Sequence, residues 1–186
     1  MQSQSGTLRL FFALTPGATQ SAALAEQVAP LVVQLHAQRV APENFHATLC
    51  FIGAVAPERL ASLKDVAAGI RGKSATLCFD ALEHWAKPGV VCATVSDNSR
   101  LEPMCALAQR LATDSTAAGF SPDFKPFRAH VTVARKVQRA AAATCEWPHP
   151  LAPPIVVGCD RFALMESRRG ESGSIYSVVE SWPLYA

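Results

Sequence analysis

The pattern of apolar and polar positions along this chain predicts a mixture of strands and helices. Short apolar runs rich in β-branched and aromatic residues, bounded by Gly, Pro or Asn, are typical of buried strands. Apolar residues that recur every three or four positions over a longer stretch are typical of helices with one buried face. On these criteria we expect strands at 8–14, 44–53, 75–82, 90–95, 129–134, 155–166 and 174–181, and helices at 18–36, 57–71 and 101–118.

Proline and glycine mark the ends of these elements. Pro30 lies inside the first predicted helix, and we expect it to kink that helix or to end its first part. Gly119 follows the third predicted helix and is placed to cap its end. The turn sequence at 87–89 lies between two apolar runs, so those runs predict a hairpin. We expect loops in the Pro- and Ala-rich span 139–154 and in the polar, Gly-rich span 167–173.

The two halves of the chain repeat one order of elements: apolar strand, helix, loop, and a strand that opens with His-x-Thr. Leu8 to His46 spans 38 positions, and Val91 to His130 spans 39. Sequence identity between the halves is slight, so the repeat is one of topology and not an array of repeats. It predicts a single α+β domain over residues 1–186, built as two pseudo-twofold lobes.

Composition and charge limit the function classes. The chain has 186 residues, 49% of them hydrophobic, which is enough for one domain with a real core. Its 17 basic and 15 acidic residues give a net charge of +2. This balance argues against an extended nucleic-acid-binding surface but permits a small basic cleft with a short RNA contact. No apolar stretch approaches the roughly 18 residues of a membrane span, so we expect no membrane association and a cytoplasmic protein.

The cysteines do not suggest a metal site or a disulfide framework. The six cysteines include no Cys-x-x-Cys pair, and several lie in apolar runs typical of buried strands. We expect them to be reduced core residues. Cys145 and His149 lack a second pair of ligands at suitable spacing, so we expect no metal and no other cofactor.

The two His-x-Thr segments carry the clearest chemistry in the chain. In a strand alternate side chains share a face, so His46 and Thr48 point one way, as do His130 and Thr132. If the two strands lie together in related lobes, two imidazoles and two hydroxyls surround a volume the size of one phosphate. One neutral histidine can take a proton from water while the other, protonated, gives a proton to a leaving oxygen. The threonines can donate to the nonbridging oxygens.

Two arginines flank the second segment and are candidates for binding the phosphate through bidentate donors. Strict alternation puts Arg128 on the face of His130 and Arg135 on the opposite face. Arg135 joins the site only if the strand bends, bulges or ends before it. The aromatic residues Phe11, Phe12 and Phe51 are expected in the core, although an aromatic at the cleft rim would suit a nucleobase.

These residues resemble the two-histidine (2H) phosphoesterases, and within them the bacterial RNA 2′,3′-cyclic phosphodiesterases historically called 2′-5′ RNA ligases. The resemblance covers nearly the whole chain. It rests on Arg-Leu-Phe-Phe-Ala-Leu at 9–14, Glu-Asn-Phe-His-Ala-Thr-Leu at 43–49 running into Phe-Ile-Gly at 51–53, His-Val-Thr-Val-Ala-Arg at 130–135 and Trp-Pro-Leu at 182–184.

The resemblance implies a bilobal fold of two antiparallel sheets flanked by helices, with the active site in the cleft between the lobes. It implies metal-free opening of a 2′,3′-cyclic phosphate at an RNA 3′ end to leave a 2′-phosphomonoester. By position, His46 would be the proton donor to the leaving 3′ oxygen and His130 the proton acceptor that activates water. Thr48, Thr132 and Arg135 would hold the phosphate. The resemblance therefore favours a local irregularity before Arg135, against strict alternation, and leaves Arg128 the weaker candidate.

The chain departs from the family pattern at Ala129, where proline usually precedes the second histidine. This change loosens the backbone and removes no catalytic group. The expected partners are RNA 3′ ends or small cyclic nucleotides, and the expected state is a monomer. Two alternatives stay open: 2′-5′ RNA ligation, which is the reverse reaction on tRNA halves, and noncatalytic binding of RNA ends or nucleotides.

Overall fold

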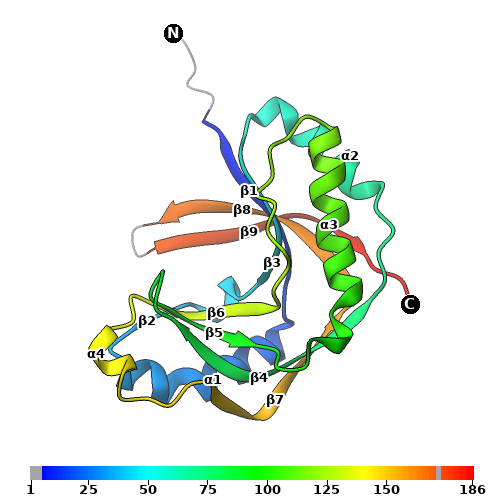
Figure 1. Ribbon diagram of the computed structural model, residues 1–186. Helices are drawn as coiled ribbons and strands as arrows, with labels where there is room; N and C mark the ends of the chain where they lie inside the picture. The colour runs from blue at the N-terminus through cyan, green and yellow to red at the C-terminus, as the bar shows by residue number, and fades with distance from the viewer. Residues whose placement is uncertain (1–5, 171–172) are drawn as a thin grey trace.

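Two antiparallel sheets form the framework of the protein in the computed structural model, which describes residues 6–170 and 173–186 (Figure 1). One sheet has four strands in the order β3-β1-β8-β9, and the other has five in the order β2-β6-β5-β4-β7. The strands are β1 (Leu8–Leu14), β2 (Gln38–Arg39), β3 (Ala47–Val55), β4 (Ala75–Trp85), β5 (Val90–Thr94), β6 (His130–Arg135), β7 (His149–Cys159), β8 (Arg161–Gly170) and β9 (Gly173–Pro183).

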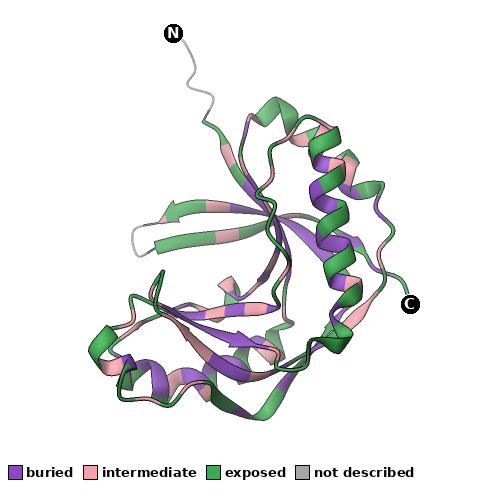
Figure 2. Cartoon of the chain, viewed as in Figure 1, coloured by how far each residue is buried: buried purple, intermediate pink, exposed green. Residues whose placement is uncertain are grey.

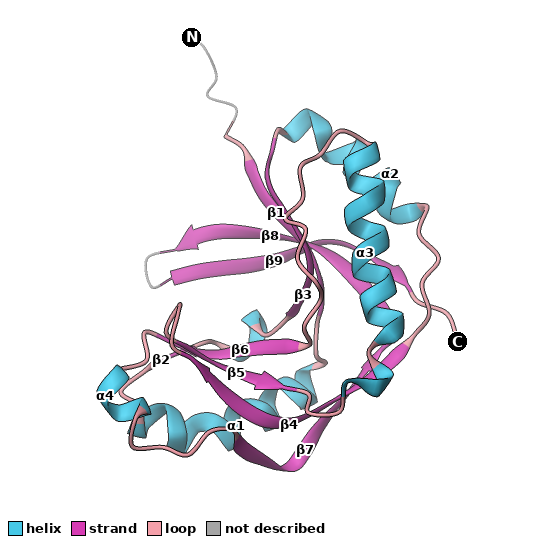
Figure 3. Cartoon of the chain, in the orientation of Figure 1, coloured by secondary structure: helices cyan, strands magenta, loops and turns pink. Residues whose placement is uncertain are grey.

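Helices cover one side of each sheet (Figure 3). Helix α1 follows β1 in the chain but packs against the five-stranded sheet, and α3 follows β5 but packs against β3 of the four-stranded sheet. Each lobe is therefore built from both halves of the chain. The helices are α1 (Ala18–Gln34), α2 (Leu60–Ala68), α3 (Glu102–Ala117) and the short α4 (Arg139–Ala142), with 3₁₀ turns at Pro42–Asn44, Pro57–Arg59 and Asn98–Arg100.

The predicted repeat is present as topology. In the first half of the chain α1 lies between β1 and β3 in sequence, and these two strands pair antiparallel. In the second half α3 lies between β5 and β6 in sequence, and these strands also pair antiparallel. The expected α+β architecture of two antiparallel sheets with flanking helices is confirmed. Among the described residues, no helix is long and apolar enough to cross a membrane.

The core lies mainly between the sheets and their helices, where the buried residues of Figure 2 gather. Phe12 is fully buried there and packs edge-on against Phe162. A second, small apolar cluster forms under the opposite face of the four-stranded sheet and includes Phe11 and Met165, with Phe51 and Tyr176 packed against it. The four-stranded sheet therefore carries buried apolar side chains on the face away from its helices as well.

Pro30 does not interrupt the first helix, so the expectation that it ends the first part of that helix is wrong. Helix α1 runs unbroken from Ala18 to Gln34. Pro30 lies on the exposed side. Buried residues such as Leu24, Val28 and Leu31 on the other side hold the helix against the sheet and offset the hydrogen bond that proline cannot donate.

The C-terminal third differs most from the sequence prediction. The span 139–154 is not a loop throughout, because it contains α4 and the start of β7. Pro150, Pro153 and Pro154 are tolerated within β7 because it is an edge strand, where a missing N–H can face away from the sheet. The single strand expected at 155–166 is two strands in different sheets, β7 and β8, which separate at Asp160.

The remaining differences are at element ends. The strand expected from residue 44 starts at Ala47 because a 3₁₀ turn precedes it, and the helix expected at 57–71 begins as a 3₁₀ turn and ends at Ala68. Gly119 follows α3 with φ of 80°, as a capping glycine requires. The loop expected at 167–173 is shorter, because β8 continues to Gly170; residues 171–172 of that loop lie outside the described part of the chain.

Candidate active site

A cleft of about 490 Å³ lies between the two sheets. Its walls come from β1, β3, β8 and β9 on one side and from β6 on the other. Clefts of roughly 300–1,000 Å³ are typical of small-molecule sites, so this one has room for more than a single phosphate. The lining residues are Arg9, Phe11, His46, Thr48, Phe51, His130, Thr132, Arg135, Ser167, Arg169, Ser174 and Tyr176.

His46 borders the cleft immediately before β3 and is held at one ring nitrogen. Its Nδ1 donates to the carbonyl oxygen of Asn44 at 2.7 Å. A carbonyl only accepts, so Nδ1 carries the hydrogen and Nε2 of the neutral ring is left free. The ring packs against Phe11, with ring centroids 4.9 Å apart, and against the edge of Tyr176 at 4.7 Å.

His130 is the first residue of β6 and is held in the same way. Its Nδ1 donates to the carbonyl oxygen of Arg128 at 2.7 Å, again two residues earlier in the chain. Its ring contacts that of Trp85, with centroids 4.7 Å apart. Both histidines therefore present Nε2 as the nitrogen free for proton transfer.

Both imidazoles are neutral in the free cleft at pH 7. The pKa of His46 is lowered to about 4: burial lowers it more than the hydrogen bond to Asn44 raises it, and the Arg135 cation, together with His130 when that ring is protonated, acts in the same direction as burial. Burial also lowers the pKa of His130, with the nearby Arg128 guanidinium acting in the same direction. A bound anion would act against these causes and favour the charged form of the ring.

The two threonines share the face of their histidines, as alternation predicts. Thr48 and Thr132 both line the cleft. The residues between histidine and threonine, Ala47 and Val131, are buried in the core. The Thr132 hydroxyl lies 3.7 Å from the Cys92 sulfur on the neighbouring strand.

Arg135 lines the cleft although it lies five residues after His130. The register between β5 and β6 shifts here: Val91 pairs with Ala134, but Cys92 pairs with Thr132, so Val133 is an extra, bulged residue. The irregularity expected before Arg135 is therefore present. An Nη2 of Arg135 also donates to the Tyr176 hydroxyl at 3.4 Å, which joins the two walls of the cleft.

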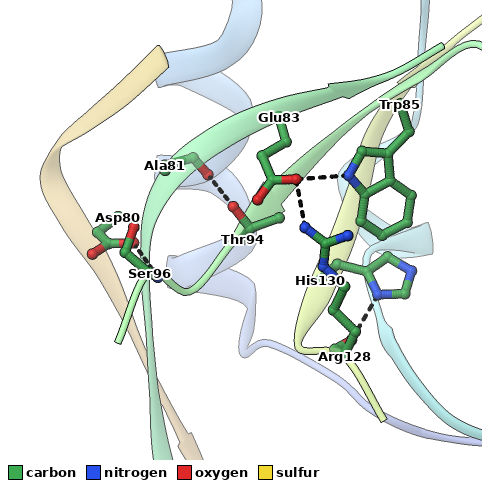
Figure 4. A network of polar contacts seen from close by, with 8 residues as sticks. All are labelled: Asp80, Ala81, Glu83, Trp85, Thr94, Ser96, Arg128 and His130. Carbon is green, nitrogen blue, oxygen red and sulfur yellow. Dashed lines mark hydrogen bonds and ion pairs between the residues drawn. The ribbon is translucent and has the colours of Figure 1, made fainter. Parts of the chain in front are cut away.

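Arg128 does not line the cleft in the part of the chain that the structure describes. Its guanidinium donates to Glu83 at 2.6 Å and lies 4.6 Å from the centroid of Trp85 (Figure 4). Arg128 contributes to the site through its backbone carbonyl, which holds His130.

Sequence reasoning missed the outer ends of β8 and β9, residues 166–170 and 173–177, here called the arm. Ser167 pairs with Tyr176 and Arg169 pairs with Ser174 across the arm, and all four line the cleft. Residues 167–173 were expected to be a loop, which hid Ser167 and Arg169, and the predicted strand at 174–181 had no pairing to show which of its faces meets the cleft. Arg9 was also missed, and its signal was its spacing of two from Phe11 on β1.

The described lining residues include three arginines and two histidines but no carboxylate. Such a wall suits an anionic ligand. In the described parts of the chain, three or more His, Cys, Asp or Glu side chains do not come together as metal ligands would. The donors present at the cleft can bind an anion and exchange protons with it.

Comparison with known proteins relates the chain to one family. The family described as LigT like Phosphoesterase matches residues 14–92 and 97–176. The RNA 2′,3′-cyclic phosphodiesterase of Escherichia coli is 29% identical over 148 residues, which cover 78% of this chain and 78% of that protein. The protein of the same name from Archaeoglobus fulgidus is 31% identical over 117 residues, covering 59% of this chain and 64% of that protein.

Solved structures agree with the sequence comparison. The crystal structure of E. coli LigT in apo form superposes with a TM-score of 0.83 at 25% identity, covering 98% of this chain and 100% of that one. The structure of E. coli LigT complexed with 3′-AMP gives a TM-score of 0.79 at 25% identity, covering 96% and 98% of the two chains. The structure complexed with phosphate gives 0.78 at 26% identity, covering 98% and 100%.

Proposed function

Because this chain belongs to the LigT-like phosphoesterase family, we propose that it hydrolyses RNA 2′,3′-cyclic phosphodiester ends to 2′-phosphomonoesters. Two relatives are named RNA 2′,3′-cyclic phosphodiesterase: the E. coli protein, which matches 78% of the chain, and the A. fulgidus protein, which matches 59% of it. E. coli LigT, which shares the fold, has been crystallised with 3′-AMP and with phosphate. These names support a substrate that combines a nucleotide with a terminal phosphate.

One observation carries the proposal. His46 and His130 each donate Nδ1–H to the carbonyl two residues earlier, and both border one cleft. A site that only binds a phosphate needs cations and hydroxyls, whereas two imidazoles with free Nε2 atoms can also move protons. This arrangement favours catalysis over simple binding.

In the proposed reaction the two histidines act on opposite sides of the phosphorus. His130 takes a proton from water, and the water oxygen forms a bond to phosphorus. The bond from phosphorus to O3′ breaks, and His46 donates its proton to O3′, so the phosphate stays on O2′. Each such proton transfer typically contributes about 100-fold to 10,000-fold to the rate.

The proposed acid must be protonated when the substrate is bound. Burial and the nearby Arg135 cation lower the pKa of His46 to about 4 in the free cleft. The negative charge of the cyclic phosphate raises that pKa because it stabilises the imidazolium. His46 is thus charged mainly when substrate is present.

Thr48, Thr132 and Arg135 are proposed to hold the nonbridging oxygens. Hydroxyl and guanidinium donors stabilise the charge that develops there as water attacks. The mechanism assigns both proton transfers to histidines and uses no metal or other cofactor. We further propose that one copy suffices, because one chain supplies both histidines, and that the protein acts in the cytoplasm on RNA ends or small cyclic nucleotides.

Turnover of a nucleoside 2′,3′-cyclic phosphate in excess chelator tests the proposal. We expect full activity with chelator, a 2′-phosphate product, and losses of at least about 100-fold in both His46→Ala and His130→Ala. Asp114→Asn, on the outer helix α3, is the matched control and should keep full activity. Full activity in both histidine variants, or none in the wild type, rules the proposal out.

A further inference from the structure

Three side chains form a closed set of contacts behind His130. The carboxylate of Glu83 accepts from Trp85 Nε1 at 2.9 Å and from Arg128 Nη2 at 2.6 Å, through the same oxygen (Figure 4). The guanidinium of Arg128 also lies over the Trp85 ring. We call Glu83, Trp85 and Arg128 the Glu83 clamp.

The Glu83 clamp contacts His130 at two points. The Trp85 ring lies against the imidazole, with ring centroids 4.7 Å apart. The Arg128 carbonyl accepts from Nδ1 of the same imidazole. The Glu83 carboxylate therefore holds the Trp85 indole and the Arg128 guanidinium. Trp85 in turn contacts the His130 ring, and the Arg128 carbonyl holds its Nδ1.

The strand pattern places the Glu83 clamp beside the cleft, because Glu83 pairs with Cys92 and Cys92 pairs with the cleft residue Thr132. Glu83 and Trp85 are two residues apart on β4 and share a face. Thr94 of β5 pairs with His130 of β6 and with Ala81 of β4, so the clamp reaches across β5 from β4 to β6. Neither Glu83, Trp85 nor the Arg128 side chain lines the cleft among the described residues.

We propose that Glu83 is a positioning residue for His130, which it holds through Trp85 and Arg128 so that Nε2 stays aimed into the cleft. The ion pair between Glu83 and Arg128 does not by itself position His130. The side chains of Glu83 and Arg128 are 33% and 58% exposed, and exposed ion pairs contribute little to stability. What the carboxylate does is fix two groups that both touch one imidazole. The proposal rests on the proposed function only for its kinetic test.

Charge supports the geometry. Burial raises the pKa of the Glu83 carboxyl, but the hydrogen bonds from Trp85 and Arg128 outweigh burial and hold the pKa below its usual value. Glu83 is therefore an anion at neutral pH. Its charge raises the pKa of His130, against burial and against the Arg128 cation.

Removing the charge of the Glu83 carboxylate should lower the pKa of His130, because the other charged groups around this ring are cations. Glu83 faces it from β4 and Arg128 from the preceding loop. His46 interacts with it across the cleft, which also carries three cations. Glu83→Gln keeps an acceptor oxygen but leaves these positive charges unopposed, so the pKa of His130 falls. The charged groups concerned are Glu83, Arg128, Arg9, Arg135 and Arg169, and His46 joins them only when it is protonated.

Two measurements on the full chain test the positioning role. NMR titration of the histidine rings without substrate should show a lower pKa for His130 in Glu83→Gln than in the wild type. The pKa of His46 should change only as far as its interaction with His130 changes. Steady-state kinetics with a nucleoside 2′,3′-cyclic phosphate should show kcat reduced by about tenfold to a hundredfold in Glu83→Ala, with KM within about twofold. Trp85→Phe, which keeps a ring but loses the N–H, should fall between Glu83→Ala and the wild type.

Asp114→Asn is the matched control, because Asp114 forms an ion pair with Arg110 on the outer helix and should leave titration and kinetics unchanged. A His130 titration that Glu83→Gln does not move overturns the proposal, whatever the activity. If instead His130 titrates as expected but the wild-type chain does not hydrolyse the cyclic phosphate, the proposed function fails and the positioning role stands. Unchanged kcat in both Glu83 variants limits the clamp to a structural role and also overturns it.

Discussion

Each catalytic candidate is a histidine with one nitrogen fixed and the other free. The carbonyls of Asn44 and Arg128 fix the Nδ1–H tautomer without adding a charge. Burial then keeps both rings neutral in the absence of ligand. Whether these two histidines are protonated therefore depends on the charge of the ligand that enters the cleft.

A bound anion should raise the pKa of His46 well above its free value of about 4, because negative charge stabilises the imidazolium. NMR titration with and without sulfate, whose charge is constant over the titration, measures the change. His36, exposed and outside the cleft, is the internal control. Identical His46 titrations at saturating sulfate would contradict the assignment of an anion site.

The leaving group distinguishes the proposed acid from the proposed base. When sulfur replaces O3′ in the cyclic phosphate, the bond from phosphorus to sulfur breaks and the leaving group is a thiolate, which needs no proton donor. We expect this substrate to restore about 100-fold or more of the rate lost in His46→Ala, and to restore little in His130→Ala. Restoration in His130→Ala alone would reverse the two roles.

At the level of elements, strand parity accounts for part of the site and tertiary contacts for the rest. Period-two alternation was sufficient to place His46 with Thr48 and His130 with Thr132. Arg135 could not be placed by alternation, because its position depends on the bulge at Val133. That bulge follows from the pairing of β6 with β5, which local sequence does not specify.

The arm shows a second reason for incomplete prediction. The apolar run 155–166 has no strong turn signal at Asp160, where the chain leaves one sheet for the other. The switch depends on which strands are already paired. With 167–173 taken as a loop, Arg169 had no strand to place it on, and Tyr176 lay on a predicted strand whose partner was not known.

Helix α1 tests whether packing outweighs a local defect. Pro30 lies within this unbroken helix on its exposed side, so Pro30→Ala removes no core contact and restores a backbone donor. We expect the free energy of unfolding to rise by about 1–2 kcal/mol, the gain in the helix less the entropy that proline removes from the unfolded chain. Urea unfolding monitored by circular dichroism measures it, and a lower stability in the variant would contradict this account of the helix.

At the scale of the whole molecule, the cleft exists because each lobe turns one sheet face toward the other. The helices occupy the far faces, and the four-stranded sheet contributes aromatic residues and arginines to the cleft while β6 contributes one His-x-Thr segment. The cost of this arrangement is two partly buried imidazoles in a positively charged site.

That cost predicts how stability depends on pH. The pKa of His46 is about 4 in the folded chain and about 6.5 in an unfolded one. As the pH falls from 6.5 toward 4 the unfolded chain takes up a proton that the folded chain does not, so the free energy of unfolding falls by about 3 kcal/mol from this group. His130 acts in the same direction.

Urea unfolding of the wild type and of His46→Gln at a series of pH values isolates that contribution. The difference between the two proteins should change across this window and level off below pH 4, because other groups titrate alike in both. Parallel pH dependences would show that burial of His46 does not depress its pKa.

The central claim is that two histidines open a cyclic phosphate with water and leave the phosphate on the 2′ oxygen. Phosphorus NMR of a nucleoside 2′,3′-cyclic phosphate in heavy-oxygen water with excess chelator tests it most directly. The account predicts one product, a 2′-phosphate that carries one heavy oxygen from water, formed by the wild type and not by the His46→Ala/His130→Ala double variant. A 3′-phosphate product, or conversion that persists in the double variant, would contradict it.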